Sequence, residues 1–366
     1  MTHSSREKKP GAWRTMAVGL WFLLSLAQPA AAAHMLVVPG EPMPDLEFEE
    51  LLAAQDYPRL GLPQRSGPFR LSQVPGEVLI VEFFNKSCVP CQRQVRHLEA
   101  FYQEVARSEL AGRVRVLAVA AGNQAKYLYK YRESRGLTYP IAADPQFDQW
   151  RRLGDPGRTP FSLFLRKKDG LWTLVNSYFG VQLESEFHAH TRFALSRESV
   201  PHHPRAGENS EAPHFALPLE APGIQEAALR LLGRAAGTEV TVQVLALAQG
   251  TSVYRAFRQG RPLDLYARLA TRGAVCEVCH AVHFLFAFDS RGRVLGFEPI
   301  HVTKVGNEEW DLEDNRFFEG RLAGRPMAGL QFDPEMDAVS MATMSSALIF
   351  DEVRRAADLV KLLPRP

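Results

Sequence analysis

The chain has 366 residues, which is more than a single hydrophobic core usually organises and favours two domains. Hydrophobic residues make up 46% and charged residues 23%, an ordinary composition that argues against a disordered or fibrous protein. The formal net charge is only +2, and the basic excess lies in the first 33 residues, so the nearly neutral remainder offers no electrostatic basis for nucleic-acid binding.

Residues 1–33 have the pattern of an export signal. A basic start is followed by the apolar run 16–27, and small residues then precede a cleavage site after Ala33. The run is short for a membrane span, although an uncleaved signal would leave the protein anchored to a membrane. No later segment approaches about 20 continuous apolar residues, so we expect a soluble body exported to a bacterial periplasm.

All four cysteines lie in two C-x-x-C pairs, Cys88 with Cys91 and Cys276 with Cys279. A structural disulfide framework would normally spread its cysteines over longer spacings. Two close pairs in an exported chain therefore indicate redox or cofactor chemistry. An inert local disulfide is the alternative interpretation of each pair.

The first pair lies between a predicted strand and a predicted helix. Residues 78–84 form an apolar run broken only by Glu82, which suits a buried parallel strand. From Cys91 onward apolar residues recur at helical spacing, so Cys88 stands at the N-terminus of a helix. Exposed backbone N–H groups and the helix dipole stabilise a thiolate there. We therefore predict Cys88 as the nucleophile and Cys91, one turn into the helix, as the buried resolving thiol.

Further strands and helices follow in alternation. The pattern predicts a strand over 114–122, a helix over 124–136, two strands within 158–180 around a turn at 168–170, and a closing helix over 184–196. Strand–helix alternation followed by a hairpin indicates an α/β sheet with mixed strand pairing.

This part of the chain resembles the thioredoxin fold, and within it the exported disulfide reductases related to TlpA and to cytochrome c maturation. The resemblance covers residues 40–196 and is carried by the C-V-P-C motif at Cys88, the preceding strand and the dipeptide Thr159-Pro160. It implies that the Thr159–Pro160 peptide is cis, lies against the redox pair and binds the backbone of the partner protein.

The same resemblance assigns a role to Glu82. This residue falls six positions before Cys88, where the family carries a buried acid that accepts the proton of the second cysteine. A carboxyl group inside an apolar strand should have a raised pKa, which fits that role, and a merely paired buried acid is the alternative. The family usually has Trp before the first cysteine, whereas this chain has Ser87, so the substrate surface and the redox potential stay open.

The second half of the chain is predicted as a linker and a second domain. Prolines and polar residues are concentrated in 197–224, which indicates the linker, and 225–366 is the second domain. This domain should contain a strand over 238–248, a hairpin over 283–300 and an amphipathic helix near the chain end. Small hydroxyl residues precede that helix, where they can cap it or where a phosphate can bind.

A hairpin followed by D-x-x-[ST]-x-A-T and a C-terminal helix resembles the FMN-binding domain of exported electron-transfer subunits. Asp337, Ser340, Ala342 and Thr343 match this pattern. The resemblance implies an α+β domain and FMN joined through its phosphate to Thr343. The family usually has a small residue where this chain has Met341, and a capped helix in a flavin-free relative is the alternative.

The second cysteine pair stands in the sequence C-E-V-C-H, which fits three chemistries. As a haem c site, Cys276 and Cys279 would bond the haem, His280 would be an axial ligand, and His283 or His301 could be a second one. As a metal site, both cysteines with His280 and His283 would bind zinc, although zinc usually takes ligands from two separated segments. As a dithiol, the second pair would exchange disulfides with the first pair through the linker.

The sequence therefore predicts an α/β thioredoxin domain joined to an α+β domain. The leading hypothesis is an exported thiol–disulfide oxidoreductase whose second domain supplies or drains electrons. Its partners would be proteins with disulfides or thiols, with an electron donor that the sequence does not identify. The alternative is a non-catalytic module that recognises cysteine-bearing client proteins such as apocytochromes.

Overall fold

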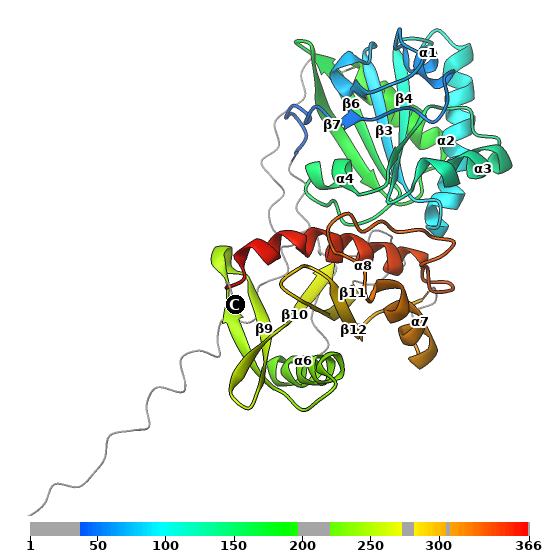
Figure 1. Cartoon of the computed structure of the whole chain (residues 1–366). Helices are drawn as coiled ribbons and strands as arrows, with labels where there is room; N and C mark the ends of the chain where they lie inside the picture. Colours follow the sequence, from blue (N-terminus) through cyan, green and yellow to red (C-terminus); the bar gives the residue numbers. More distant parts are fainter. Residues whose placement is uncertain (1–36, 197–219, 273–281, 305–307, 365–366) are drawn as a thin grey trace, which may run out of the picture.

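The computed structural model describes residues 37–196, 220–272, 282–304 and 308–364 (Figure 1). The predicted export signal, most of the predicted linker and the C-E-V-C-H sequence lie outside these residues. None of the helices in the described part of the chain combines the length and the apolar character that a membrane span requires.

The first domain is built on a five-stranded sheet in the order β5-β4-β3-β6-β7. Strands β3, β4 and β5 are parallel to one another, whereas β6 pairs antiparallel with β3 and with β7. The bounds are β3 Val78–Phe84, β4 Val114–Ala121, β5 Ile141–Asp144, β6 Phe161–Lys168 and β7 Leu171–Phe179. This succession of a β-α-β unit and a β-hairpin with a closing helix is the thioredoxin fold that the sequence predicts.

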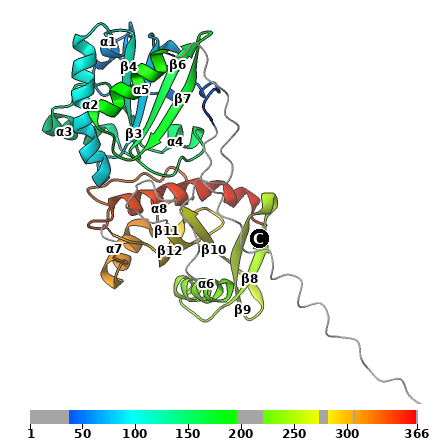
Figure 2. The same cartoon turned by 180° about the vertical axis from the view of Figure 1, so that it is seen from behind.

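Helices cover both faces of this sheet (Figures 1 and 2). Along β3 the side chains alternate between the two faces, so that Ile80 and Phe84 pack with α2 while Val81 and Phe83 pack with α4. Helix α5 lies beside α2 on the same face. The bounds are α1 Asp56–Leu60, α2 Val89–Arg107, α3 Ala125–Arg135, α4 Asp148–Arg152 and α5 Glu184–Ser196. A two-stranded ribbon, β1 Glu47–Phe48 with β2 Phe69–Arg70, lies near the start of the domain.

The second domain contains a fully antiparallel sheet in the order β12-β11-β10-β9-β8. Helix α6 packs on one face of the sheet, and α7 and α8 pack on the other. The strands are β8 Thr241–Ala246, β9 Ser252–Arg258, β10 Arg261–Arg272, β11 Val282–Phe288 and β12 Val294–His301, and the helices are α6 Ala221–Ala236, α7 Leu312–Leu322 and α8 Thr343–Arg355. The α+β class and the β11-β12 hairpin agree with the sequence prediction.

The predicted linker boundary is wrong by about one helical turn. Residues 197–224 are predicted as linker, yet α6 begins at Ala221 inside that range. Pro222 lies in the first turn of α6, where its missing N–H removes no helical hydrogen bond. The helix forms because Ile224 and Leu231 bury their side chains against the sheet, a contact that a local Pro-Gly sequence does not reveal.

The second domain lies against the end of the first sheet at which the parallel strands β3 and β4 finish (Figures 1 and 2). The Arg151 guanidinium donates two hydrogen bonds of 3.0 Å to the Asp351 carboxylate on α8. Arg272, the last residue of β10, lies 2.8 Å from Asp155 of the first domain. Because Asp351 is 3% and Arg272 8% exposed in their side chains, these ion pairs lie inside the interface. A continuous cluster of buried apolar side chains also joins the two cores.

Candidate active site

The first cysteine pair stands at the start of α2, as predicted. Cys88 is the residue that caps the helix N-terminus, and its Sγ accepts a hydrogen bond of 3.4 Å from the backbone N–H of Cys91. The helix dipole and the free N–H groups of the first turn stabilise negative charge on a sulfur in this position. Cys88 is 1% and Cys91 0% exposed, and the two sulfurs are not bonded to each other.

Two asparagines hold the segment between β3 and α2. The Asn85 side chain donates to the Ala121 carbonyl oxygen at 2.7 Å and accepts from the Ser87 N–H at 2.8 Å. Asn123 accepts from the Lys86 N–H at 2.8 Å. These bonds tie the cysteine-bearing turn to the end of β4. Sequence reasoning missed both residues, although an Asn directly after a buried strand is a recognisable turn signal.

The Thr159–Pro160 peptide is cis, as the sequence predicts. It lies just before β6, and both residues are buried. The Cys88 thiol lies 3.5 Å from the Thr159 carbonyl oxygen and is in place to donate to it. The structure therefore brings the cis peptide and the first cysteine together, although they are 71 residues apart in the chain.

Glu82 is buried in the middle of β3, with 1% of its surface exposed. Its side chain points to the face of the sheet that α2 covers, between Ile80 and Phe84. Burial raises the pKa of Glu82 to about 8, against the opposing effect of a hydrogen bond from the Ser162 hydroxyl. The carboxyl group therefore carries its proton at pH 7, and it can accept another group's proton only after it has ionised, near pH 8.

Tyr131 of α3 also borders the redox pair and was not predicted. Its ring stacks on Phe84 with the ring centres 6.0 Å apart. Its hydroxyl is buried and has no hydrogen-bond partner within the described ranges. Burial, reinforced by the nearby charge of Cys91, raises the pKa of Tyr131 to about 12, so this phenol stays protonated. The regular tyrosine spacing in 127–131 gave no hint of this position, because it also suits an exposed helix face.

The residues predicted to attach a flavin lie at the start of α8. Thr343 is the first residue of the helix, and the preceding Ala342 gives no side-chain cap. Asp337 is 5% exposed, and its carboxylate accepts hydrogen bonds from the Arg325 guanidinium and from the backbone N–H of Asp333. Ser340 is exposed, and Met341 has a left-handed backbone with φ of 58°. A helix end without a side-chain cap suits a phosphate.

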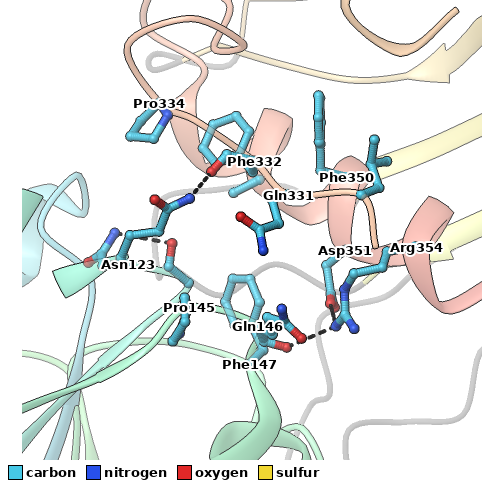
Figure 3. Close-up of a pocket in the computed structure, with 14 residues that line it drawn as sticks. Asn123, Pro145, Gln146, Phe147, Gln331, Phe332, Pro334, Phe350, Asp351 and Arg354 are labelled. Atoms are coloured by element: carbon cyan, nitrogen blue, oxygen red, sulfur yellow. Dashed lines mark hydrogen bonds and ion pairs between the residues drawn. The ribbon is translucent and has the colours of Figure 1, made fainter. Parts of the chain in front are cut away.

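A cavity of about 200 Å³ lies between the domains, beside α8 (Figure 3). Phe147 and Gln146 line it from the first domain, and Phe350 and Arg354 line it from α8. Thr343 stands one turn before the part of α8 that lines this cavity, so a group attached to it would face this space. Pockets for whole cofactors usually measure about 300–1,000 Å³, so this cavity is smaller than that range.

Of the predicted haem or metal ligands, the structure describes only His283 and His301. His283 is the second residue of β11 and lies opposite Thr271 of β10; it is 2% exposed, and its Nδ1 lies 3.0 Å from the Thr271 hydroxyl. Burial lowers the pKa of His283 to about 4, so it is neutral at pH 7. The His301 ring lies 6.4 Å away on the neighbouring strand. Cys276, Cys279 and His280 lie outside the described residues.

Comparison with known proteins places the similarity in the first domain. Residues 39–160 match the AhpC/TSA family. The thiol-disulfide oxidoreductase ResA of Geobacillus kaustophilus is 32% identical over 101 residues, which cover 28% of this chain and 55% of ResA. The protein DipZ of Mycobacterium tuberculosis is 32% identical over 92 residues, 23% of this chain and 12% of DipZ. The chain therefore matches about half of ResA and a small part of DipZ.

Two solved structures match part of this chain at low sequence identity. A thiol:disulfide interchange protein of the thioredoxin family from Chlorobium tepidum has 18% identity and a TM-score of 0.33, covering 42% of this chain and 97% of its own. StoA from Bacillus subtilis has 16% identity and a TM-score of 0.32, covering 41% of this chain and 99% of its own.

Proposed function

We propose that the protein is an exported thiol–disulfide oxidoreductase of the ResA type that acts on disulfide-bearing or thiol-bearing proteins. The observation that carries the proposal is the assembly of one redox site from three distant parts of the chain. Cys88 caps α2, contacts the carbonyl group before cis-Pro160, and shares a sheet face with the buried acid Glu82. The similarity of the first domain to ResA supports the same activity.

In the direction of partner reduction, the Cys88 thiolate attacks one sulfur of the partner's disulfide. The partner's S–S bond breaks, a mixed disulfide forms, and the other partner sulfur leaves as a thiolate. Cys91 then loses its proton to Glu82 and attacks the Cys88 sulfur. The Cys88–Cys91 disulfide forms, the second partner thiolate leaves, and two electrons have passed to the partner. Thr159 and Pro160 hold the partner's backbone against the pair.

A trapping experiment tests this function. Cys91→Ser should accumulate a mixed disulfide between Cys88 and partner proteins, because the resolving sulfur is absent. The double variant Cys88→Ser/Cys91→Ser is the matched control and should trap none. Insulin reduction by the full chain distinguishes the alternative, a non-catalytic module for clients such as apocytochromes. A chain without any reductase activity and without trapped partners would favour that alternative.

We also propose that the second domain exchanges electrons with the first through Cys276 and Cys279. Arg272 of β10 pairs with Asp155, and Asp155 precedes Thr159 by only four residues. Cys276 follows Arg272 by only four residues in the sequence. In the exchange, the thiolate of one pair attacks the disulfide of the other, and the electron pair moves with the bond.

Haem at Cys276, Cys279 and His280, zinc with His280 and His283, and FMN at Thr343 are the competing proposals for the second domain. One measurement separates them, namely an intact mass and a visible spectrum of the protein exported from its native host. A Soret band with a haem-sized mass increment supports haem, and flavin absorbance with an FMN-sized increment supports FMN. A metal analysis detects zinc. A colourless, metal-free protein supports the dithiol.

A further inference from the structure

Glu82 belongs to a buried network of hydrogen bonds that extends beyond the redox pair. In the sheet register Glu82 stands opposite Ser162 of β6 and Ala118 of β4. Ser162 is 0% exposed, and its hydroxyl donates to the Glu82 carboxyl group. A hydroxyl at this register position is notable because its neighbours on the same face, Ile80 and Phe164, are apolar.

The network continues from Ser162 to the helix that carries the redox pair. The Gln182 side-chain NH₂ donates to the Ser162 hydroxyl oxygen at 2.6 Å. The Gln182 backbone N–H donates to the side-chain oxygen of Gln94 at 2.7 Å. Gln94 lies on α2, three residues after Cys91, and is 1% exposed. Because Ser162 receives a proton from Gln182, its single hydroxyl hydrogen is left to face Glu82.

Three atoms of the same network have no hydrogen-bond partner in the described part of the chain. They are the second carboxyl oxygen of Glu82, the side-chain nitrogen of Gln94 and the side-chain oxygen of Gln182. A buried polar atom without a partner costs about 1–3 kcal/mol, so such atoms are rarely left unpaired. The three atoms are one donor, the Gln94 nitrogen, and two acceptor oxygens. A single buried water can accept one hydrogen bond and donate two, so it would satisfy all three.

Other titratable groups face Glu82 from the packed elements. Helix α2 contributes Cys88 and Cys91 to the apolar cluster on this face. Tyr139, before β5, is fully buried and senses the charge of Glu82. On α5, His190 packs on Phe164 rather than on Glu82 itself, and burial lowers its pKa. Of these groups, the Cys91 thiol is the one that must lose a proton in the proposed reaction.

We propose that Ser162 and Gln182 are positioning residues that orient Glu82 as the acceptor of the Cys91 proton, and that Gln94 and Gln182 hold a buried water beside its second carboxyl oxygen. This inference rests on the proposed oxidoreductase function. In this step an ionised Glu82 takes up the proton that the Cys91 thiol loses. The Cys91 thiolate then attacks the Cys88 sulfur, so the charges balance within the buried site.

The test measures the resolving step alone as a function of pH. In the full chain with Cys276→Ser and Cys279→Ser, Cys88 is converted to its mixed disulfide with 2-nitro-5-thiobenzoate. Release of the coloured thiolate then reports attack by Cys91. The rate should rise as the pH passes the pKa of Glu82. Ser162→Ala removes a hydrogen bond that stabilises the carboxylate, so its rate profile should move up by about one pH unit, about tenfold slower at pH 7.

Gln182→Leu should shift the profile in the same direction by a smaller amount, because the Ser162 hydroxyl remains but is free to turn away. Thr191→Val is the matched control, since Thr191 is a buried hydroxyl on α5 with no partner in the described residues. It should leave the profile unchanged. In a Glu82→Gln background, Ser162→Ala should have no further effect on the profile, because the group through which Ser162 acts is gone.

Two results would overturn the inference. One is a Ser162→Ala profile that coincides with that of the parent chain, with folding checked by circular dichroism. The other is an equal loss of rate at every pH, which would indicate a purely structural role. Failure of the oxidoreductase function looks different, because thiolate release would then be absent in the parent chain too.

Discussion

The starts of α2 and α8 show how differently two helix ends in one chain can be used. At α2 the capping residue is a cysteine, so the group that satisfies the first-turn N–H is also the reactive sulfur. At α8 the capping position is Ala342, which offers no side-chain acceptor, and the chain enters through a left-handed Met341. The first site is complete within the described residues, whereas the second has only part of what a cofactor needs.

The two ends also differ in what surrounds them. Around Cys88 the cis peptide, the buried acid and the asparagine-held turn come from separate strands and converge on one sulfur. Around Thr343 the polar groups are already engaged in holding the fold, as in the Asp337 contact with Arg325. Whether the groups of a matched motif can act therefore depends on which of them the tertiary structure leaves available.

The largest expected effect breaks the first site. Cys88→Ser should abolish insulin reduction, since an alcohol at this position neither ionises near neutral pH nor forms a disulfide. Ser196→Ala, an exposed hydroxyl at the end of α5, serves as the control and should leave the rate unchanged. Residual activity in Cys88→Ser would mean that another sulfur performs the reaction.

The next largest effect concerns the ion pairs between the two domains. Asp351→Ala removes the carboxylate that pairs with Arg151 and lies 3.7 Å from the buried Arg272. Breaking a buried ion pair leaves an uncompensated charge, so the free energy of unfolding should fall by about 3 kcal/mol. Chemical denaturation measures it. Asp358→Ala is the control, because its pair with Lys361 is on the surface and should contribute almost nothing.

A third prediction uses the opposite pH responses of the two domains. The pKa of Glu82 is about 8 in the folded protein, against an ordinary value of 4.5. Between these pH values the folded protein keeps a proton that the unfolded chain releases. Stability therefore falls as the pH rises from 4.5 to 8. Glu82→Gln should stabilise the protein at pH 8 by on the order of 3 kcal/mol and have little effect below pH 5.

His283 in the second domain should act in the other direction. Its pKa is lowered from 6.5 to about 4, so the buried neutral ring opposes protonation and stability is lost as the pH falls through that window. Between pH 4.5 and 6.5 the two effects oppose each other, so in denaturation across pH 4–9 the parent chain should lose stability chiefly between pH 6.5 and 8, and Glu82→Gln should remove this loss and leave the acid slope of His283 exposed. A Glu82→Gln curve parallel to that of the parent chain would refute the burial argument.

The smallest expected change in stability concerns Met341, just before α8. Met341 has φ of 58° and is 62% exposed, so its side chain contributes little packing while its backbone is strained. Met341→Gly should therefore stabilise the protein by about 0.5–1 kcal/mol. Met336→Gly is the matched control, because Met336 is similarly exposed at 56% but does not have a positive φ. This variant should destabilise the protein slightly.

Local sequence patterns were enough to predict much of the first domain. The apolar run of β3, the helical spacing after Cys91 and the hairpin turn at Asp169-Gly170 all depend on neighbouring residues, and the structure has them in place. The cis peptide at Pro160 followed from the family resemblance. The second domain was predicted less completely. Strands β9 and β10 and helix α7 were missed because their patterns are less regular, and α6 was hidden by Pro222.

Only the tertiary structure decided which polar groups meet. Ser162 reaches Glu82 across 80 residues, and Arg151 reaches Asp351 across 200. Sheet register and domain docking determine such contacts, and both depend on the burial of many apolar side chains together rather than on any local sequence signal. The amino-acid sequence by itself therefore determined the helix that begins after Cys88, and the folded chain decided which polar groups lie around that cysteine.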